Sequence, residues 1–274
     1  MRNSSLIFVA GGALYALLAT FIAGYTSVNI ALGINQMGIN LPLREPINLA
    51  LVILFFAVWC RFSGSKPINN IGNGNAKSVL IGAIVAILIL VISWGVLAAL
   101  SQIEFIKAQP KEPVFSIIAA AIIPLILIFI HGLAEQYLIQ RVAQSITISR
   151  FGHINSILIG AAVFAGLQAM QGYKGLGFIL SSINLGLLLA ILAQKYGLLA
   201  AASLHGFWTW AETSLLGHFT QAHFANNFLA GGGTDSYGSL AFALVCLFAA
   251  LGLYFGLGLF KPLDYKLNND KIEH

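Results

Sequence analysis

The chain has 274 residues, of which 58% are hydrophobic and only 8% are charged, and its formal net charge is +5 at pH 7. A soluble globular domain carries about 25% charged residues, so this composition excludes a soluble fold and indicates an integral membrane protein. The basic residues are scattered rather than gathered on one face, and the positive charge therefore does not indicate nucleic-acid binding.

The N-terminal part of the chain contains three apolar runs, which predict three membrane helices. The first covers residues 6 to about 32 and lacks a convincing small-x-small cleavage site, so we interpret it as an uncleaved anchor. Residues 47–62 and 79–100 predict the second and third helices. The segment between them, residues 63–77, is rich in Gly, Asn and Ser, which is typical of a flexible polar loop. Residues 102–113 are expected to be a charged connector.

The fourth predicted helix, residues 114–149, combines a membrane-spanning apolar stretch with polar groups in its second half. An ionisable residue inside a membrane helix costs roughly 2.5 to 3.5 kcal/mol on insertion scales, so it is interpreted first as functional. His131 and Glu135 are four residues apart and share a helix face, as do Gln136 and Gln140, and Arg141 follows. Pro124 is expected to kink the helix or to free backbone groups near these side chains.

Four further apolar runs complete the prediction of an all-α, polytopic membrane protein with about eight transmembrane helices. They are residues 154–170, 178–194, 198 to about 216, and 240–260, with residues 217–238 forming a long loop. Arg150 and Gly152 are expected to end the fourth helix. The seventh contains His205 among small residues, which let a neighbouring helix approach closely. Glu212 lies two turns further on, and a position at the rim is the expectation for it.

The distribution of basic residues predicts the orientation of these eight helices. Of the 14 Lys and Arg residues, ten fall on the side of the two termini and four on the opposite side. Because cytoplasmic loops carry the excess of Lys and Arg, both termini are expected in the cytoplasm, with the protein in the cell membrane. The chain is expected to form one membrane domain with three parts: residues 1–112, a central core of residues 113–216, and residues 217–274.

Three short segments of the core, AEQYLIQR, FAGLQ and HGFWT, lie on three different predicted helices. Their order and spacing resemble the motifs of the CAAX protease and bacteriocin-processing family, whose type II CAAX prenyl endopeptidases are eight-helix membrane proteins. That family has two adjacent glutamates followed after three residues by arginine and then usually glycine, next Phe-x3-His, and finally His-x3-Asn. The stretch KYGLLAAASLHGFW also resembles the family's approach to the third motif, and the likeness covers roughly residues 117–212.

The match is made residue by residue, with several substitutions. Glu135 and Gln136 occupy the places of the paired glutamates, Gln140 falls at the arginine position, and Arg141 falls at the usual glycine. In the second motif Phe164 matches and Gln168 replaces the histidine. In the third motif His205 matches and Thr209 replaces the asparagine.

The resemblance implies a membrane-embedded glutamate endopeptidase, because in that family a glutamate and the second-motif histidine are taken to activate water against a peptide bond. Glu135 would be the general base, His205 with Gln168 would stabilise the oxyanion, and His131 could stand in for the missing histidine. The remaining matched positions are expected to line a shared cavity that holds the substrate. These are Gln136, Gln140, Arg141, Phe164, Gln168 and Thr209.

Two other hypotheses stay open beside the peptidase. A non-catalytic relative would use the same cavity to bind a hydrophobic or lipidated peptide, or another membrane protein. A carrier or metal site built from His131, Glu135 and His205 is a weaker option, and we expect neither a metal nor another cofactor. Because the amide of Gln168 cannot take up a proton, little or no peptidase turnover is the expectation from the sequence, and enzymatic activity stays undecided.

Overall fold

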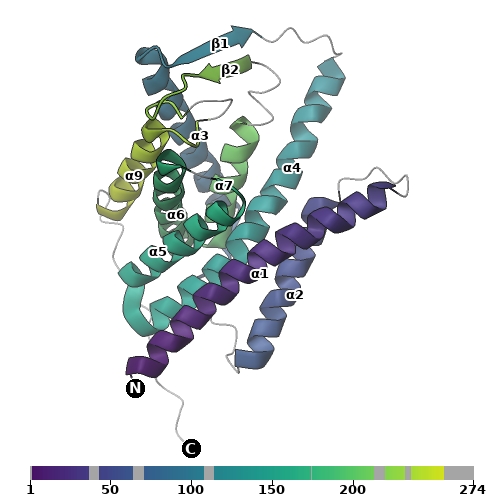
Figure 1. Ribbon diagram of the computed structural model, residues 1–274, viewed down its shortest axis with the longest axis vertical. Coiled ribbons are helices and arrows are strands. Elements are labelled where there is room, and N and C mark those ends of the chain that lie inside the picture. The colour runs from purple at the N-terminus through teal and green to yellow at the C-terminus, as the bar shows by residue number, and fades with distance from the viewer. Residues whose placement is uncertain are drawn as a thin grey trace, which may run out of the picture.

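The computed structural model describes residues 2–36, 43–63, 71–107, 114–173, 175–212, 220–231 and 236–255. These residues form an all-α bundle that carries one small sheet at one end (Figure 1). The helices are α1 (Arg2–Gln36), α2 (Arg44–Ser63), α3 (Ala76–Ala99), α4 (Val114–Leu138), α5 (Ser145–Met170), α6 (Leu176–Tyr196), α7 (Leu198–Trp210) and α9 (Leu240–Phe255). A π-helical segment, η1 (Ile139–Gln144), joins α4 to α5. The two strands are β1 (Ile103–Lys107) and β2 (Thr220–Phe224).

Five apolar helical segments among the described residues are long enough to cross a membrane: Ser5–Gln36, Arg44–Ser63, Ala76–Ala99, Ile122–Met170 and Leu176–Tyr196. Their outer faces carry large apolar side chains, such as Leu80, Ile84 and Val91 on α3, which are 59%, 47% and 61% exposed. Side chains of this kind suit contact with lipid and not with water. The protein is therefore an integral membrane protein.

The 49-residue apolar segment Ile122–Met170 is two helices rather than one. The prediction that the chain breaks at Gly152 is confirmed, because this glycine has non-helical dihedral angles, φ 81° and ψ −178°, inside α5. The seventh and eighth predicted helices are only partly described. Helix α7 has 13 residues and α9 has 16, and the expected continuations at residues 213–216 and 256–260 lie outside the described part of the chain.

Residues 102–113, expected to be a charged connector, and residues 217–238, expected to be a long loop, each contain one short strand. Strands β1 and β2 pair in antiparallel register, from Ile103 opposite Phe224 to Lys107 opposite Thr220. The Ala225 N–H also donates to the carbonyl of Gln102 at 2.9 Å. A pairing between segments more than a hundred residues apart leaves no local pattern in the sequence, because each strand is short and only the partner satisfies its backbone groups.

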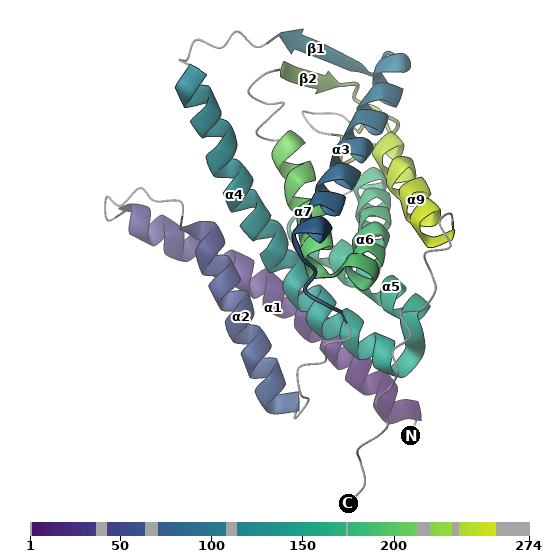
Figure 2. The same cartoon turned by 180° about the vertical axis from the view of Figure 1, so that it is seen from behind.

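Helix α7 lies at the centre of the bundle, where it packs against α3, α4 and α6. Two glycines bring α4 and α7 to backbone contact: a Cβ at Gly206 would lie 2.9 Å from Phe129 Cα, and one at Gly132 would lie 2.8 Å from the carbonyl oxygen of Ala202. This close approach is what the small residues around His205 predict. Helix α1 packs against α2, α4, η1 and α5, as the view from behind also shows (Figure 2).

Helix α4 continues without a break through Pro124. The departure from α-helical geometry lies further along, in η1, where all six side chains are buried. A π-helical segment inserts an extra residue into a turn, and such segments are frequent at functional sites. Nothing in the local sequence singles out residues 139–144, so η1 could not be predicted from the sequence.

Candidate functional site

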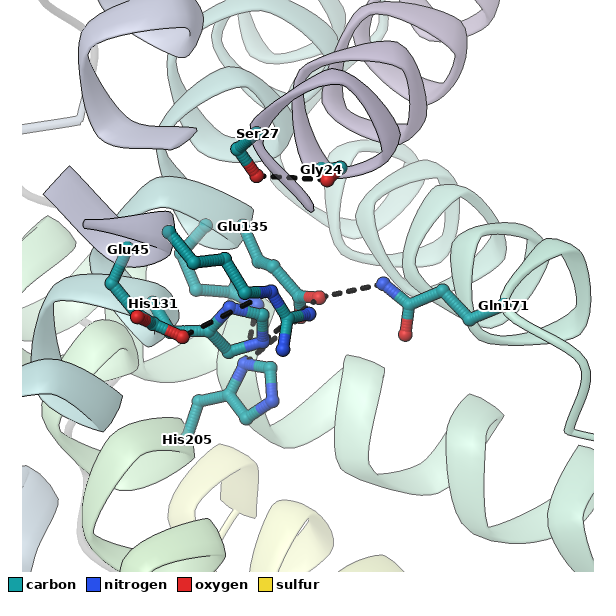
Figure 3. A network of polar contacts seen from close by, with 9 residues as sticks. Gly24, Ser27, Glu45, His131, Glu135, Gln171 and His205 are labelled. Atoms are coloured by element: carbon teal, nitrogen blue, oxygen red, sulfur yellow. Dashed lines mark hydrogen bonds and ion pairs between the residues drawn. The ribbon is translucent and has the colours of Figure 1, made fainter. Parts of the chain in front are cut away.

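Glu135 lies at the centre of a polar cluster inside the bundle (Figure 3). It is 2% exposed, and both of its carboxylate oxygens face histidines. Nε2 of His131, one turn earlier on α4, lies 3.3 Å from Oε1, and Nδ1 of His205 on α7 lies 3.5 Å from Oε2. Gln171, directly after α5, donates from its side-chain nitrogen to Oε1 at 2.7 Å. Three separate elements thus converge on one carboxylate.

A second layer of side chains holds His205 in place. Its ring packs edge-on against Phe164, with ring centres 5.5 Å apart, and its Nδ1 lies 3.5 Å from the side-chain nitrogen of Gln136. Gln140 in turn donates to the side-chain oxygen of Gln136 at 2.9 Å. A protonated Nδ1 would donate to Glu135, whereas an unprotonated Nδ1 would accept from Gln136. The proton on His205 is therefore linked to the charge on Glu135.

Two cavities meet at this cluster. The inner cavity has a volume of about 110 Å³ and lies between α4, α5 and α7, while the outer cleft has a volume of about 500 Å³ and extends between α1 and α2. The side chains that line both are His131, Glu135, Gln171 and Tyr173. The carboxylate of Glu135 consequently lies in the wall between the two. Among the described residues no donor hydrogen-bonds to its Oε2, which is buried beside Nδ1 of His205.

The structure places the other predicted cavity residues in two groups. Gln168 and Thr209 line the inner cavity together with Glu135 and both histidines. Gln136, Gln140 and Phe164 are buried beside His205 but do not line either of these two cavities.

Arg141 is not part of the cavity, contrary to the expectation from the sequence. Its guanidinium donates from Nη1 to the backbone oxygen of Ile71 at 2.6 Å and from Nη2 to the side chain of Asn73. Neighbouring helical residues point in different directions, so a polar residue next to a site residue need not face the same site. Arg141 instead fixes the segment that precedes α3.

Glu212 lies inside the bundle, although the sequence predicted a position at the rim. It is only 7% exposed and lines the inner cavity. Its Oε1 accepts from Trp94 Nε1 at 3.4 Å and from the backbone N–H of Ser236 at 3.2 Å, and also from the Ser236 hydroxyl. Glu212 thereby joins the end of α7 to α3 and to the segment before α9. An acidic residue in an apolar run was the available signal for burial.

The first two helices also contribute to the site, although no residue of theirs was among the predicted site residues. Thr20 and Tyr25 of α1 and Arg44 and Asn48 of α2 line the outer cleft. Asn48 is 4% exposed, and its side-chain oxygen has no hydrogen-bond partner among the described residues. The signal in the sequence that could have predicted this position is an amide side chain inside an otherwise apolar helix.

Within the described residues, no group of three or more His, Cys, Asp and Glu side chains is arranged to hold a metal ion. Comparison of the sequence with protein-family models and with curated proteins found no match.

Proposed function

We propose that the protein is a membrane-embedded endopeptidase of the glutamate type, related to the CAAX protease and bacteriocin-processing family, with a site rebuilt around His131. One observation supports this more than any other. Glu135 is buried between His131 at 3.3 Å and His205 at 3.5 Å, in the wall between an inner cavity and an outer cleft. A carboxylate with histidines at both oxygens has the groups that general acid–base catalysis on water requires.

The reaction follows from these positions. A water molecule in the inner cavity, whose volume of about 110 Å³ has room for it, gives a proton to Glu135 as its oxygen attacks the carbonyl carbon of the peptide bond. A hydrogen bond from His205 stabilises the resulting oxyanion. His131 relays the proton from Glu135 to the leaving amine, and the C–N bond breaks.

The position of His131 supports proton transfer, although the substitution at Gln168 led us to expect little or no turnover. Gln168 cannot move a proton, yet His131 lies within reach of the carboxylate and can do so in its place. Gln168 still lines the inner cavity, where its side-chain N–H can add a second donor to the oxyanion.

The outer cleft supports a hydrophobic or lipidated peptide as the substrate. Its volume of about 500 Å³ lies within the range of roughly 300 to 1,000 Å³ for ligand pockets. Phe21, Tyr25 and Val28 of α1 give it one apolar wall, and the polar residues Arg44 and Asn48 of α2 line it as well. A substrate in this cleft would reach Glu135 from the side of α1 and α2.

The proposal includes eight membrane crossings in the cell membrane, with both termini in the cytoplasm. The distribution of Lys and Arg, ten on one side and four on the other, supports this orientation. Helices α7 and α9 would be the crossings that are shorter within the described residues.

The test is cleavage of a farnesylated peptide by the purified protein in lipid vesicles, followed by mass spectrometry of the products. We expect cleavage that falls by about 10²-fold or more in Glu135→Gln and in His131→Ala. Unchanged cleavage in both variants, or no cleavage of a panel of lipidated and hydrophobic peptides by the folded protein, would reject the peptidase.

The second candidate function is binding of such a peptide without cleavage. The observation that favours it is the hydrogen bond from Gln171, which already occupies one oxygen of Glu135 at 2.7 Å. In the same vesicles, a photo-crosslinkable farnesylated peptide would then label the protein equally with and without Glu135→Gln, and no product would form.

A further inference from the structure

A third cavity lies away from the site, where α3 begins beside the end of α6. Its volume is about 470 Å³. Two cations line it, Lys77 in the first turn of α3 and Lys195 in the last turn of α6, and none of the lining residues is acidic. Neither the peptidase nor the binding function uses this cavity.

The backbone on one side of the cavity is held firmly. Leu198 and Leu199 donate from their N–H groups to the carbonyls of Gly72 and Asn73, at 2.9 and 2.8 Å. Gly197, with φ 93°, lies so close that a Cβ there would be 2.5 Å from the Gly74 nitrogen. A flexible loop was expected here from the sequence. Residues 71–75 are instead held by hydrogen bonds from the start of α7 on one side and from Arg141 on the other.

The ammonium group of Lys195 indicates that the cavity binds an anion. Lys195 is half-buried, and its Nζ is covered but has no hydrogen-bond partner among the described residues. It lies 5.5 Å from the centre of the Tyr196 ring. A buried cation without an acceptor is costly, and an anion that enters the cavity removes that cost.

The start of α3 adds a second reason for an anion. The helix has 24 residues, and its N-terminus, capped by Asn75, opens onto the cavity. The positive end of a helix dipole favours negative charge, and together with nearby lysines it matches the three oxygens of a phosphate group. In the proposed topology Lys77 and Lys195 also lie on the side where the basic residues concentrate, which would face the membrane surface that is rich in anionic lipid.

We propose that this cavity binds a phosphate group through Lys195, Lys77 and the N-terminus of α3. The group comes from the headgroup of an anionic phospholipid or from free phosphate, since both present the same oxygens. The cavity is larger than a phosphate ion and leaves room for the rest of a headgroup.

The experiment uses the full-length protein in a neutral detergent, titrated separately with inorganic phosphate and with short-chain phosphatidylglycerol. Native mass spectrometry counts the bound molecules. We expect one saturable site, with an affinity that falls about tenfold or more in the Lys77→Gln, Lys195→Gln double variant, because charge-assisted hydrogen bonds are lost. Lys195→Arg keeps the charge and should keep most of the binding.

Arg61→Gln is the matched control, since it removes an exposed cation at the end of α2 that does not line the cavity. Saturable binding of phosphatidylglycerol alone supports a headgroup, and binding of both probes supports any phosphate. Binding of neither probe overturns the proposal. So does an equal loss in Arg61→Gln and in the double variant, because attraction to the basic surface as a whole would then explain the affinity. Thermal unfolding of each variant verifies that it is folded.

Discussion

At the scale of single residues, the site is a set of polar side chains that satisfy one another inside an apolar bundle. Glu135 meets His131, His205 and Gln171, and Gln136 meets both His205 and Gln140. Each of these groups would be expensive if it faced lipid alone, and each lowers that cost by contact with the next.

Replacing Gln168 by histidine should increase peptidase turnover. The side chain lines the inner cavity beside Glu135, and an imidazole there restores a group that can take up and release a proton. We expect kcat for a farnesylated peptide to rise by up to about 10²-fold. The control is Gln102→His, which adds the same imidazole outside the cavity. A Gln168→His variant that is folded and no faster than the parent would show that His131 already supplies all the proton transfer.

Glu212→Leu should destabilise the protein. The substitution removes the acceptor shared by Trp94 and Ser236 and loosens the junction between α7, α3 and the start of α9. Leaving buried donors without that acceptor should lower the free energy of unfolding by about 1 to 3 kcal/mol. Thermal unfolding in detergent measures it, with Glu104→Leu on the exposed face of β1 as the control. Equal midpoints for the two variants would contradict a structural role for Glu212.

The sequence predicted part of this site. Spacing placed His131 and Glu135 on one face, and the rarity of ionisable groups in the core drew attention to His205. It did not predict that Gln171 would donate to Glu135, because this contact depends on where α5 ends relative to α4. That relation is a property of packing between helices.

At the scale of elements, the distance between α4 and α7 determines whether the site exists. Glu135 and His205 come from different helices, and their side chains meet because Gly132 and Gly206 allow the two backbones to touch. Small residues at such crossings are the usual means of close helix packing in membranes.

Gly206→Ala should separate these helices and weaken the site. The added Cβ would lie 2.9 Å from Phe129 Cα, so α7 must shift. We expect a loss of about 1 to 3 kcal/mol in stability, typical of overpacking, together with reduced cleavage. Gly95→Ala in α3 is the control, because a Cβ there meets nothing within 4 Å. Comparable effects of both substitutions would refute the link between this crossing and the site.

Elements were predictable where they have a local pattern. The length of the apolar runs predicted the helices, and Gly152 predicted the break in α5. The pairing of β1 with β2 and the π-helical η1 were not predictable, since the first joins distant segments and the second is an adjustment to buried neighbours.

At the scale of the whole molecule, the orientation in the membrane can be tested with single cysteines in a Cys60→Ala, Cys246→Ala background. Arg61 and Glu104 are both exposed and lie on opposite sides in the proposed topology. With cytoplasmic termini, a membrane-impermeant maleimide added to intact cells should label Glu104→Cys and not Arg61→Cys. Permeabilised cells provide the control in which both react. The reverse pattern in intact cells would invert the topology.

The aromatic side chains beyond Glu135 have a consequence for proton leakage across a membrane that carries a potential. Trp208 and Tyr237 line the inner cavity, and Phe242 packs behind them, with ring centres 5.0 to 5.7 Å apart. A proton that crosses a membrane releases about 2.3 kcal/mol per 100 mV of membrane potential. A hydrated carboxylate open to both sides would therefore let protons leak across the membrane. With Glu135 within the membrane, the aromatic layer on the α9 side would separate a hydrated carboxylate from that side and would limit the leakage of protons.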